Sequence, residues 1–298
     1  MKRILSSLIF CLFASSFVFA QEGGNRVYGR NNTDSRRKPA LNTGALTGAV
    51  DGRNQQFIEA SVLLNAPADA YVAVFGFVQD GRTPALSNES VNARFVEFIR
   101  SLEKLGIKRT DIYVDFIAQN RIFEYTEEGN TITERLTGFE SKKNIAIRYK
   151  DRNLLEKILS AAGSATIFDL IEVDYIVNDS KSLRARMFEE AVRVIKQKET
   201  SYENSFEIKL TPAALTNEKY DAFYPGEQYQ SYQAFESGST YSAYNKTVIR
   251  PRKVTTFYYE PLTTTEFDAV INPAGIEPVV QFTLYLRIQY DLPDTNKK

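Results

Sequence analysis

Two acidic side chains stand two positions apart in a segment with the pattern of a β-strand. Glu172 and Asp174 project from one side of this strand, and Asp169 projects from the other. Paired carboxylates can act as acid and base in glycoside hydrolysis. Such side chains more often form a solvated face or join salt bridges. The pair therefore supplies a hydrolase hypothesis, with Glu172 and Asp174 as its residues, and nothing else in the sequence supports it.

A second distinctive stretch, from residue 220 to 244, is rich in aromatic residues and poor in charge. Its aromatic residues are Tyr220, Phe223, Tyr224, Tyr229, Tyr232, Phe235, Tyr241 and Tyr244. Tyrosine combines a large contact area with a polar tip. The stretch is therefore expected to be a contact loop that packs on its own domain, on another subunit, or on a sugar or protein ligand. The candidate contact residues are Tyr224, Tyr229, Tyr232 and Tyr241.

Basic residues follow this stretch directly and are interleaved with aromatic ones. They are Lys246, Arg250, Arg252 and Lys253, and Phe257, Tyr258 and Tyr259 come next. This pattern can bind nucleic acid, but the neighbouring acidic and aromatic loop is an equally natural partner. The whole chain has 37 Lys and Arg against 37 Asp and Glu, so no net field attracts nucleic acid. We predict no nucleic-acid partner.

Residue types that are missing limit the possible chemistry. The chain has no histidine and no tryptophan, and its only cysteine, Cys11, lies near the N-terminus. Without histidine there is no Ser-His-Asp triad, and zinc or copper would lack preferred ligands. Any catalysis would need carboxylate, lysine or tyrosine, and any metal would be a hard cation held by oxygen. We predict no enzyme activity, no catalytic residues, no metal site and no cofactor.

The first 20 residues have the features of a secretory signal peptide. Lys2 and Arg3 precede an apolar run from Leu5 to Phe19, and Ala20 is a small residue at the expected cleavage point. The run is short for a membrane span, which needs about 20 apolar residues. The sequence predicts cleavage after Ala20, no transmembrane span in the mature chain, and a periplasmic or outer-envelope location.

Hydrophobic periodicity then predicts the order of the elements. Residues 21–56 are expected to form a basic flexible leader, because they are rich in Gly, Asn and Arg and lack a hydrophobic period. Expected strands are 57–64, 70–78, 112–125, an extended stretch around 144–149, 166–177 and 280–290. Expected helices begin at Ser87 or Asn88, at Asp151, and at Asp179 or Ser180.

This order favours an α+β fold, with about three helices packed on a mainly antiparallel sheet. The strand at 280–290 must pair with an earlier strand, which makes residues 57–292 one predicted domain. A long Tyr-rich insertion at about 211–275 interrupts that domain before its last strand, and residues 293–298 form a tail.

Several stretches match one known family in order. They are Ala66-Pro67-Ala68-Asp69-Ala70, Leu105-Gly106-Ile107, Asp111-Ile112, Leu136-Thr137-Gly138-Phe139, Asn144-Ile145-Ala146-Ile147 and Leu154-Leu155-Glu156-Lys157-Ile158-Leu159. The chain thus resembles the SIMPL-domain family over roughly residues 57–200 and 277–291. The family includes bacterial periplasmic proteins described as immunogenic or as oxidative-stress defence proteins.

The resemblance implies a compact α/β domain, export, and in some members ring-like oligomers. It implies no agreed activity and no catalytic residues. The chain departs from the family pattern at Lys198-Glu199-Thr200-Ser201-Tyr202, where the third helix is expected to break off, and in the region 211–275.

These observations predict an exported, non-enzymatic envelope protein that acts by self-assembly or by binding an envelope protein or glycan, with a link to stress defence through its relatives. A homo-oligomer is the expected state. Two alternatives stay open: a hydrolase directed at glycan or cell wall, and a monomeric ligand-binding module with a pocket lined by the tyrosines of the 220–244 stretch.

Overall fold

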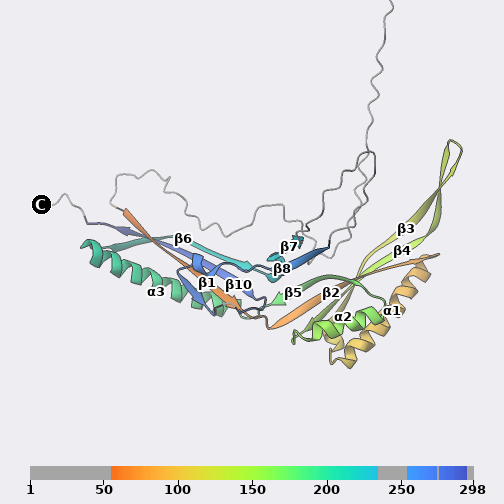
Figure 1. Cartoon of the computed structure of the whole chain (residues 1–298), viewed down its shortest axis with the longest axis horizontal. Helices are drawn as coiled ribbons and strands as arrows, with labels where there is room; N and C mark the ends of the chain where they lie inside the picture. Colours follow the sequence, from red (N-terminus) through yellow and green to blue (C-terminus); the bar gives the residue numbers. More distant parts are fainter. Residues whose placement is uncertain (1–54, 234–253, 274, 294–298) are drawn as a thin grey trace, which may run out of the picture.

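The computed structural model describes residues 55–233, 254–273 and 275–293. The predicted signal peptide, almost all of the predicted leader, Tyr241 and the basic residues at 246–253 lie outside the described residues. The described part is elongated, and its two four-stranded sheets follow one another along the long axis (Figure 1).

The first sheet, called sheet B, has the strand order β3-β4-β2-β5, and all its neighbours are antiparallel. Its strands are β2 (Ala70–Gly81), β3 (Ile112–Glu128), β4 (Thr131–Tyr149) and β5 (Asp169–Ile176). Helices α1 (Pro84–Lys104) and α2 (Leu154–Ser164) cover one face. Alternate strand residues such as Phe75 and Ile145 meet Phe98 of α1 and Ile158 of α2 in a fully buried cluster.

The second sheet, called sheet A, has the order β6-β10-β1-β9. Its strands are β1 (Gln55–Ala66), β6 (Thr211–Phe223), β9 (Ala269–Ile271) and β10 (Val280–Asp291), and only β9 runs parallel to its neighbour. Helix α3 (Ser180–Phe206) covers one face with Met187 and Ile195. The buried apolar residues of the molecule thus form two clusters, one for each sheet.

The pairing of the last strand agrees with the expectation that it returns to an early one. β10 lies antiparallel to β1, with Phe57 opposite Gln289 and Leu64 opposite Phe282. The α+β class, the three helices and the mainly antiparallel pairing predicted from the sequence are confirmed.

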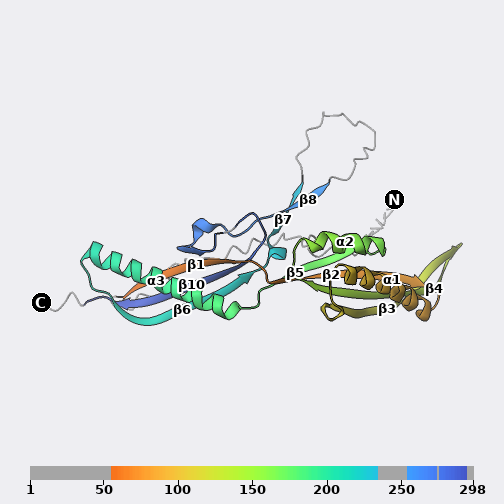
Figure 2. The same ribbon diagram turned by 90° about the horizontal axis from the view of Figure 1, so that it is seen from below.

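α1, α2 and α3 lie on the same side of the two sheets, so no helix of the described residues lies on the opposite sheet faces (Figures 1 and 2). Short elements complete the described chain: the 3-10 turns Arg109–Asp111, Pro225–Glu227 and Thr264–Glu266, and a hairpin of β7 (Tyr229–Gln233) and β8 (Thr255–Tyr259).

Two connections join the sheets at what we call the waist. Residues 67–69 lead from β1 to β2, and residues 177–179 lead from β5 to α3. The Asp69 amide donates to the Ile176 carbonyl at 2.8 Å, and the Asn178 amide donates to the Asp69 carboxylate at 2.7 Å. Asp69 therefore ties the two connections together.

The helix starts differ from the predicted ones in two cases. α1 begins at Pro84, and its N-cap is Thr83, whose hydroxyl accepts from the Leu86 amide. Proline is favoured in the first turn because it has no amide hydrogen to lose. α2 has Asn153 as N-cap, and the carboxylate of Asp151, two residues earlier, accepts from the Asn153 amide. The predicted start of α3 is confirmed, with Asp179 as N-cap.

The predicted break in α3 at 198–202 is wrong, because the helix continues to Phe206. The polar residues of this stretch make contacts with sheet A. Glu199 accepts a hydrogen bond from the Tyr290 hydroxyl at 3.1 Å, and Tyr202 packs against the core. The side chain of Lys198 reaches Asp268 at 2.6 Å and the Glu59 carbonyl at 2.8 Å. Tertiary contacts therefore hold the helix where its composition is least helical.

Asp268 gives this part of the fold a dependence on pH. Burial raises the pKa of its carboxyl, but hydrogen bonds from Lys198 and Ser61 outweigh burial and hold the pKa below its ordinary value. A carboxyl with a lowered pKa in the folded state stabilises the protein at neutral pH, and this contribution is lost as the pH falls below about 4.

We expect Asp268→Asn to lower the free energy of unfolding at pH 7 by about 1 kcal/mol, with a difference that shrinks below about pH 4. Urea denaturation at several pH values measures it. Asp221→Asn is the control, because its salt bridge with Lys219 is solvent-exposed and should contribute less than about 0.5 kcal/mol. A difference for Asp268→Asn that stays constant down to pH 2 would contradict the assignment.

Candidate functional site

The described part of the Tyr-rich stretch, residues 220–233, lies largely in strands and not in the predicted loop. Tyr220 belongs to β6, where its ring stacks on Phe282 at 5.7 Å, and Tyr229 and Tyr232 belong to β7. The loop expectation fails here because β6 pairs with β10 along its whole length. The composition of β6 is polar because it is an edge strand whose residues are mostly exposed.

The four predicted contact tyrosines do not form one surface. Tyr224 and Tyr232 are exposed, with 44% and 52% of their surface accessible. Tyr229 instead lines a cavity, and its ring lies 5.8 Å from that of Tyr259. Tyr241 lies outside the described residues. Of the three that the structure describes, therefore, only Tyr229 has the position expected of a ligand pocket.

A buried polar network anchors the segment that carries these tyrosines. Gln281 of β10 is fully buried, and its side-chain oxygen accepts from the Gln228 side chain at 2.6 Å and from the Leu262 amide at 2.7 Å. Its side-chain nitrogen donates to Asn65 at 2.7 Å. The Tyr259 hydroxyl donates to Gln228 at 3.2 Å. Gln281 therefore joins the core strands to the 225–262 segment.

The network lies on the face of sheet A opposite α3. Asn65 and Gln281 occupy positions that alternate with the apolar residues that face α3. Asn65 also donates to the Asn272 carbonyl at 2.7 Å, and Asn272 donates back to the Asn65 carbonyl at 3.3 Å. Leu262 and Asn272 therefore cover part of this polar face.

The cavity lies where sheet B meets the anchored segment. It encloses about 190 Å³. Its lining residues are Tyr71, Tyr149, Arg152, Leu155, Leu170, Val173, Tyr175, Gly226 and Tyr229. They come from β2, β4, the start of α2, β5, the 3-10 turn at 225–227 and β7. Both the helix-covered side of sheet B and the segment anchored on sheet A therefore contribute walls.

Three tyrosines from neighbouring strands form a row in this wall. In the sheet register Tyr71 pairs with Tyr149 on one side and with Tyr175 on the other. The Tyr71 ring stacks on Tyr149 at 5.4 Å and meets Tyr175 edge-on at 5.2 Å. Both arrangements are favourable for aromatic pairs. The row is held by strand pairing and by ring packing, so it is a rigid wall.

The tyrosine hydroxyls of the row are neutral at physiological pH. Burial raises the pKa of Tyr149, and the neighbouring hydroxyls of Tyr175 and Tyr71 raise it further. Burial likewise raises the pKa of Tyr175, with a further contribution from Tyr229. These phenols therefore remain hydrogen-bond donors.

One of these hydroxyls has no partner. Tyr149 is 4% exposed, and its hydroxyl makes no hydrogen bond to any of the described residues. A buried hydroxyl without a partner normally costs about 1–3 kcal/mol. Such groups are rare in folded proteins, and those that persist often have a functional explanation.

Arg152 supplies the positive charge of the cavity. It precedes α2, and its guanidinium forms a salt bridge to Glu277 at 3.5 Å. The two side chains are 41% and 74% exposed. A long, exposed ion pair contributes little to stability. The guanidinium can therefore exchange Glu277 for another acidic group at small cost.

The predicted carboxylate pair lies on the other face of sheet B. Glu172 is opposite Val74 and Asp174 is opposite Val72, so the two share one face as predicted. Burial and then the charge of Glu172 raise the pKa of Asp174, whose side chain is nevertheless solvent-exposed. Neither residue lines the tyrosine cavity. The structure brings no further reactive side chain to the pair among the described contacts.

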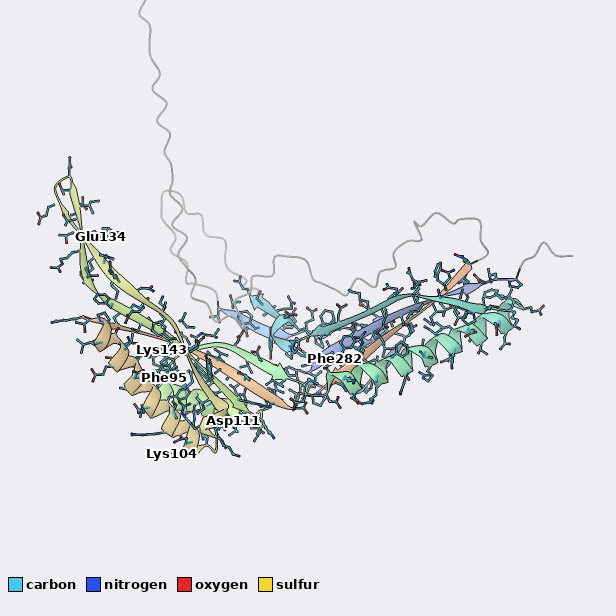
Figure 3. All side chains as sticks on the ribbon, turned by 180° about the vertical axis from the view of Figure 1, so that it is seen from behind. Phe95, Lys104, Asp111, Glu134, Lys143 and Phe282 are labelled. Carbon is cyan, nitrogen blue, oxygen red and sulfur yellow. The ribbon has the colours of Figure 1, made fainter. Side chains whose placement is uncertain are left out.

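A β-ribbon projects from the end of sheet B. Residues 131–138 of β4 pair only with β3. The two strands are joined by a two-residue turn at Gly129 and Asn130, where Gly129 has a φ of +60°. We call residues 122–138 the ribbon; Figure 3 shows Glu134 on it, far from Phe282 of sheet A.

One face of the ribbon is mostly apolar, with Glu127 and Glu134 as its two charged residues. Cross-strand partners share a face, and the pairs Phe123 with Leu136, Tyr125 with Glu134, and Glu127 with Ile132 all lie on the same one. The four large apolar side chains of that face are 42–71% exposed. The opposite face is polar, with Glu124, Thr126, Glu128, Thr131, Thr133 and Arg135. The ribbon is thus amphipathic, and no described residue covers its apolar face.

Two mainly antiparallel sheets, one covered by α1 and α2 and the other by α3, define an α+β protein with a tyrosine-lined cavity and an amphipathic ribbon. A family model described as SIMPL, a protein of unknown function (DUF541), matches residues 59–256. The match covers more than half of the 298 residues, so the chain belongs to the SIMPL family. No curated protein matches the chain.

Two kinds of feature are absent from residues 55–233, 254–273 and 275–293. None of the helices in these ranges is both long enough and apolar enough to cross a membrane. Within the same ranges, no group of three or more acidic side chains is arranged to hold a metal ion.

Sequence reasoning missed the residues that build the cavity. Tyr71, Tyr149 and Tyr175 were expected only as strand residues, and Arg152 was not singled out. The available signal was a tyrosine near one end of each of three predicted strands. Using it required the register of β2 against β4 and β5, which alternation alone does not determine.

Proposed function

We propose that the protein is an exported, non-enzymatic envelope protein that acts through self-association, and that the ribbon is its contact surface. The observation that carries this proposal is the exposed apolar face formed by Phe123, Tyr125, Ile132 and Leu136. Export is supported by the N-terminal pattern of Lys2, Arg3 and the apolar run to Phe19.

The ribbon needs a covering partner for a physical reason. A two-stranded hairpin is marginally stable in water, and apolar side chains on one face gain free energy when another surface covers them. β3 is also the edge strand of sheet B, so its outer backbone groups are available for strand pairing. A second copy of the chain offers the same face and the same edge. Two ribbons can therefore cover each other.

The Tyr-rich segment is a weaker candidate than the ribbon for the contact between copies of the chain. Tyr229 faces the cavity and Tyr220 packs on Phe282, so these rings are already in contact within the chain. Tyr232 is exposed on the β7–β8 hairpin and remains a rival contact. Self-association is therefore still expected, but its contact surface is the ribbon and not the Tyr-rich segment.

The double variant Tyr125→Ser, Ile132→Ser tests the proposal by light scattering coupled to size exclusion. We expect the unaltered protein to have a whole multiple of the chain mass, and the double variant to have the mass of one chain. Its thermal unfolding should stay within a few degrees of the unaltered protein, because the ribbon contributes no side chain to either buried cluster.

The control is Thr126→Ser, Thr133→Ser, which changes the polar face of the same ribbon. This variant should retain the full mass. An unaltered protein with the mass of one chain contradicts self-association. A mass lowered by Tyr232→Ser, and not by the ribbon variant, would place the contact on the β7–β8 hairpin.

A further inference from the structure

We propose that the tyrosine-lined cavity is a binding site for a small organic carboxylate that carries one ring. The proposal is independent of self-association, because the residues that line the cavity and those of the ribbon lie at opposite ends of sheet B.

The charge of the lining selects for an anion. Arg152 is the one charged residue among the lining residues, and the remaining polar groups are neutral tyrosine hydroxyls. Its present partner, Glu277, is not in the lining and is 74% exposed. A ligand carboxylate can therefore take the place of Glu277 and form the paired hydrogen bonds that a guanidinium favours.

The unpaired hydroxyl indicates where the carboxylate or a neighbouring oxygen lies. Tyr149 is held in the wall by Tyr71, and its hydroxyl makes no hydrogen bond to the described residues. Burial keeps this hydroxyl protonated, so it can donate a hydrogen bond to an acceptor in a ligand. A ligand oxygen in the cavity that Tyr149 lines supplies that acceptor, which none of the described residues provides.

The shape and size of the cavity select for a ring. The walls consist of tyrosine rings and of the aliphatic side chains Leu155, Leu170 and Val173. Flat apolar groups pack well against such surfaces. The cavity volume of about 190 Å³ is smaller than that of pockets for drug-sized ligands. A cavity of this size admits one ring and its substituent. Aromatic acids and sugar acids share this chemistry.

The test is isothermal titration calorimetry of the full-length protein with benzoate and, separately, with glucuronate. We expect at least one of them to bind saturably. Benzamide has the same shape as benzoate without the charge, and it should bind about tenfold more weakly than benzoate or not at all. Saturation by benzoate alone identifies an aromatic acid as the ligand class, and saturation by glucuronate alone identifies a sugar acid.

Two variants locate the site. Arg152→Gln should weaken binding about tenfold or more. Arg148→Gln is its control, because Arg148 pairs with Val72 on the other face of sheet B and is exposed. This control should bind as the unaltered protein does.

Tyr149→Phe separates a functional hydroxyl from a packing defect. Without ligand, the variant should unfold at the same temperature as the unaltered protein or a higher one, because it loses an unpaired buried group. With ligand, it should bind more weakly. The proposal is overturned if neither acid saturates, if Arg152→Gln binds as tightly as Arg148→Gln, or if Tyr149→Phe leaves the affinity unchanged.

Discussion

Replacement of Gln281 by leucine is expected to lower the free energy of unfolding by about 3–5 kcal/mol. The change removes the hydrogen-bonding group that joins Asn65, Gln228 and the Leu262 amide. Asn65 and Gln228 are 3% and 6% exposed, so water cannot readily replace the lost partner. Each buried group left unpaired costs about 1–3 kcal/mol. Urea denaturation followed by circular dichroism measures the difference.

Gln289→Leu provides a matched control on the same strand and the same face. Gln289 is partly exposed, and it pairs with Phe57 in the backbone register. Its substitution should change the free energy of unfolding by less than about 0.5 kcal/mol. Equal effects of the two substitutions would mean that the network around Gln281 does not anchor the 225–262 segment.

The second large effect is expected for Phe98→Ala, at about 3–5 kcal/mol of destabilisation. Phe98 of α1 is fully buried and meets Phe75 of β2 edge-on, with ring centres 5.7 Å apart. Truncation removes the ring from the centre of the cluster and leaves a cavity that the sheet cannot fill without moving β2. The same urea denaturation measures this loss.

Val96→Ala on the same helix is the control. Val96 is 48% exposed, so its truncation should cost less than about 0.5 kcal/mol, and alanine also has the higher helix propensity. If Phe98→Ala cost no more than Val96→Ala, the cluster under α1 and α2 would not be a stability core.

Much of the fold could be predicted from local patterns. The alternation at Ile145, Ile147 and Tyr149 placed one face of β4 in the core, and all three are buried. The apolar spacing from Val91 to Leu102 correctly predicted the buried side of α1. Both signals arise from burial of one side of an element, and such periodicity is visible in a single sequence.

The rest depended on contacts between distant segments. β6 has few buried residues of its own and is a strand because it pairs with β10. The polar end of α3 is helical because Lys198 and Tyr202 reach sheet A. The cavity required the alignment of Tyr71, Tyr149 and Tyr175 across three strands. Register and long-range pairing leave no clear trace in local composition.

The waist has a mechanical consequence for the cavity. Gly226 and Tyr229 reach the cavity from the segment anchored on sheet A, while the tyrosine row belongs to sheet B. A strand of 12 residues such as β1 is about 40 Å long, so bending by about 10° at the waist displaces the far end by about 7 Å. The cavity walls, close to the pivot, move far less. If the two sheets bend about the waist, a small change in cavity width therefore accompanies a large displacement of the sheet ends.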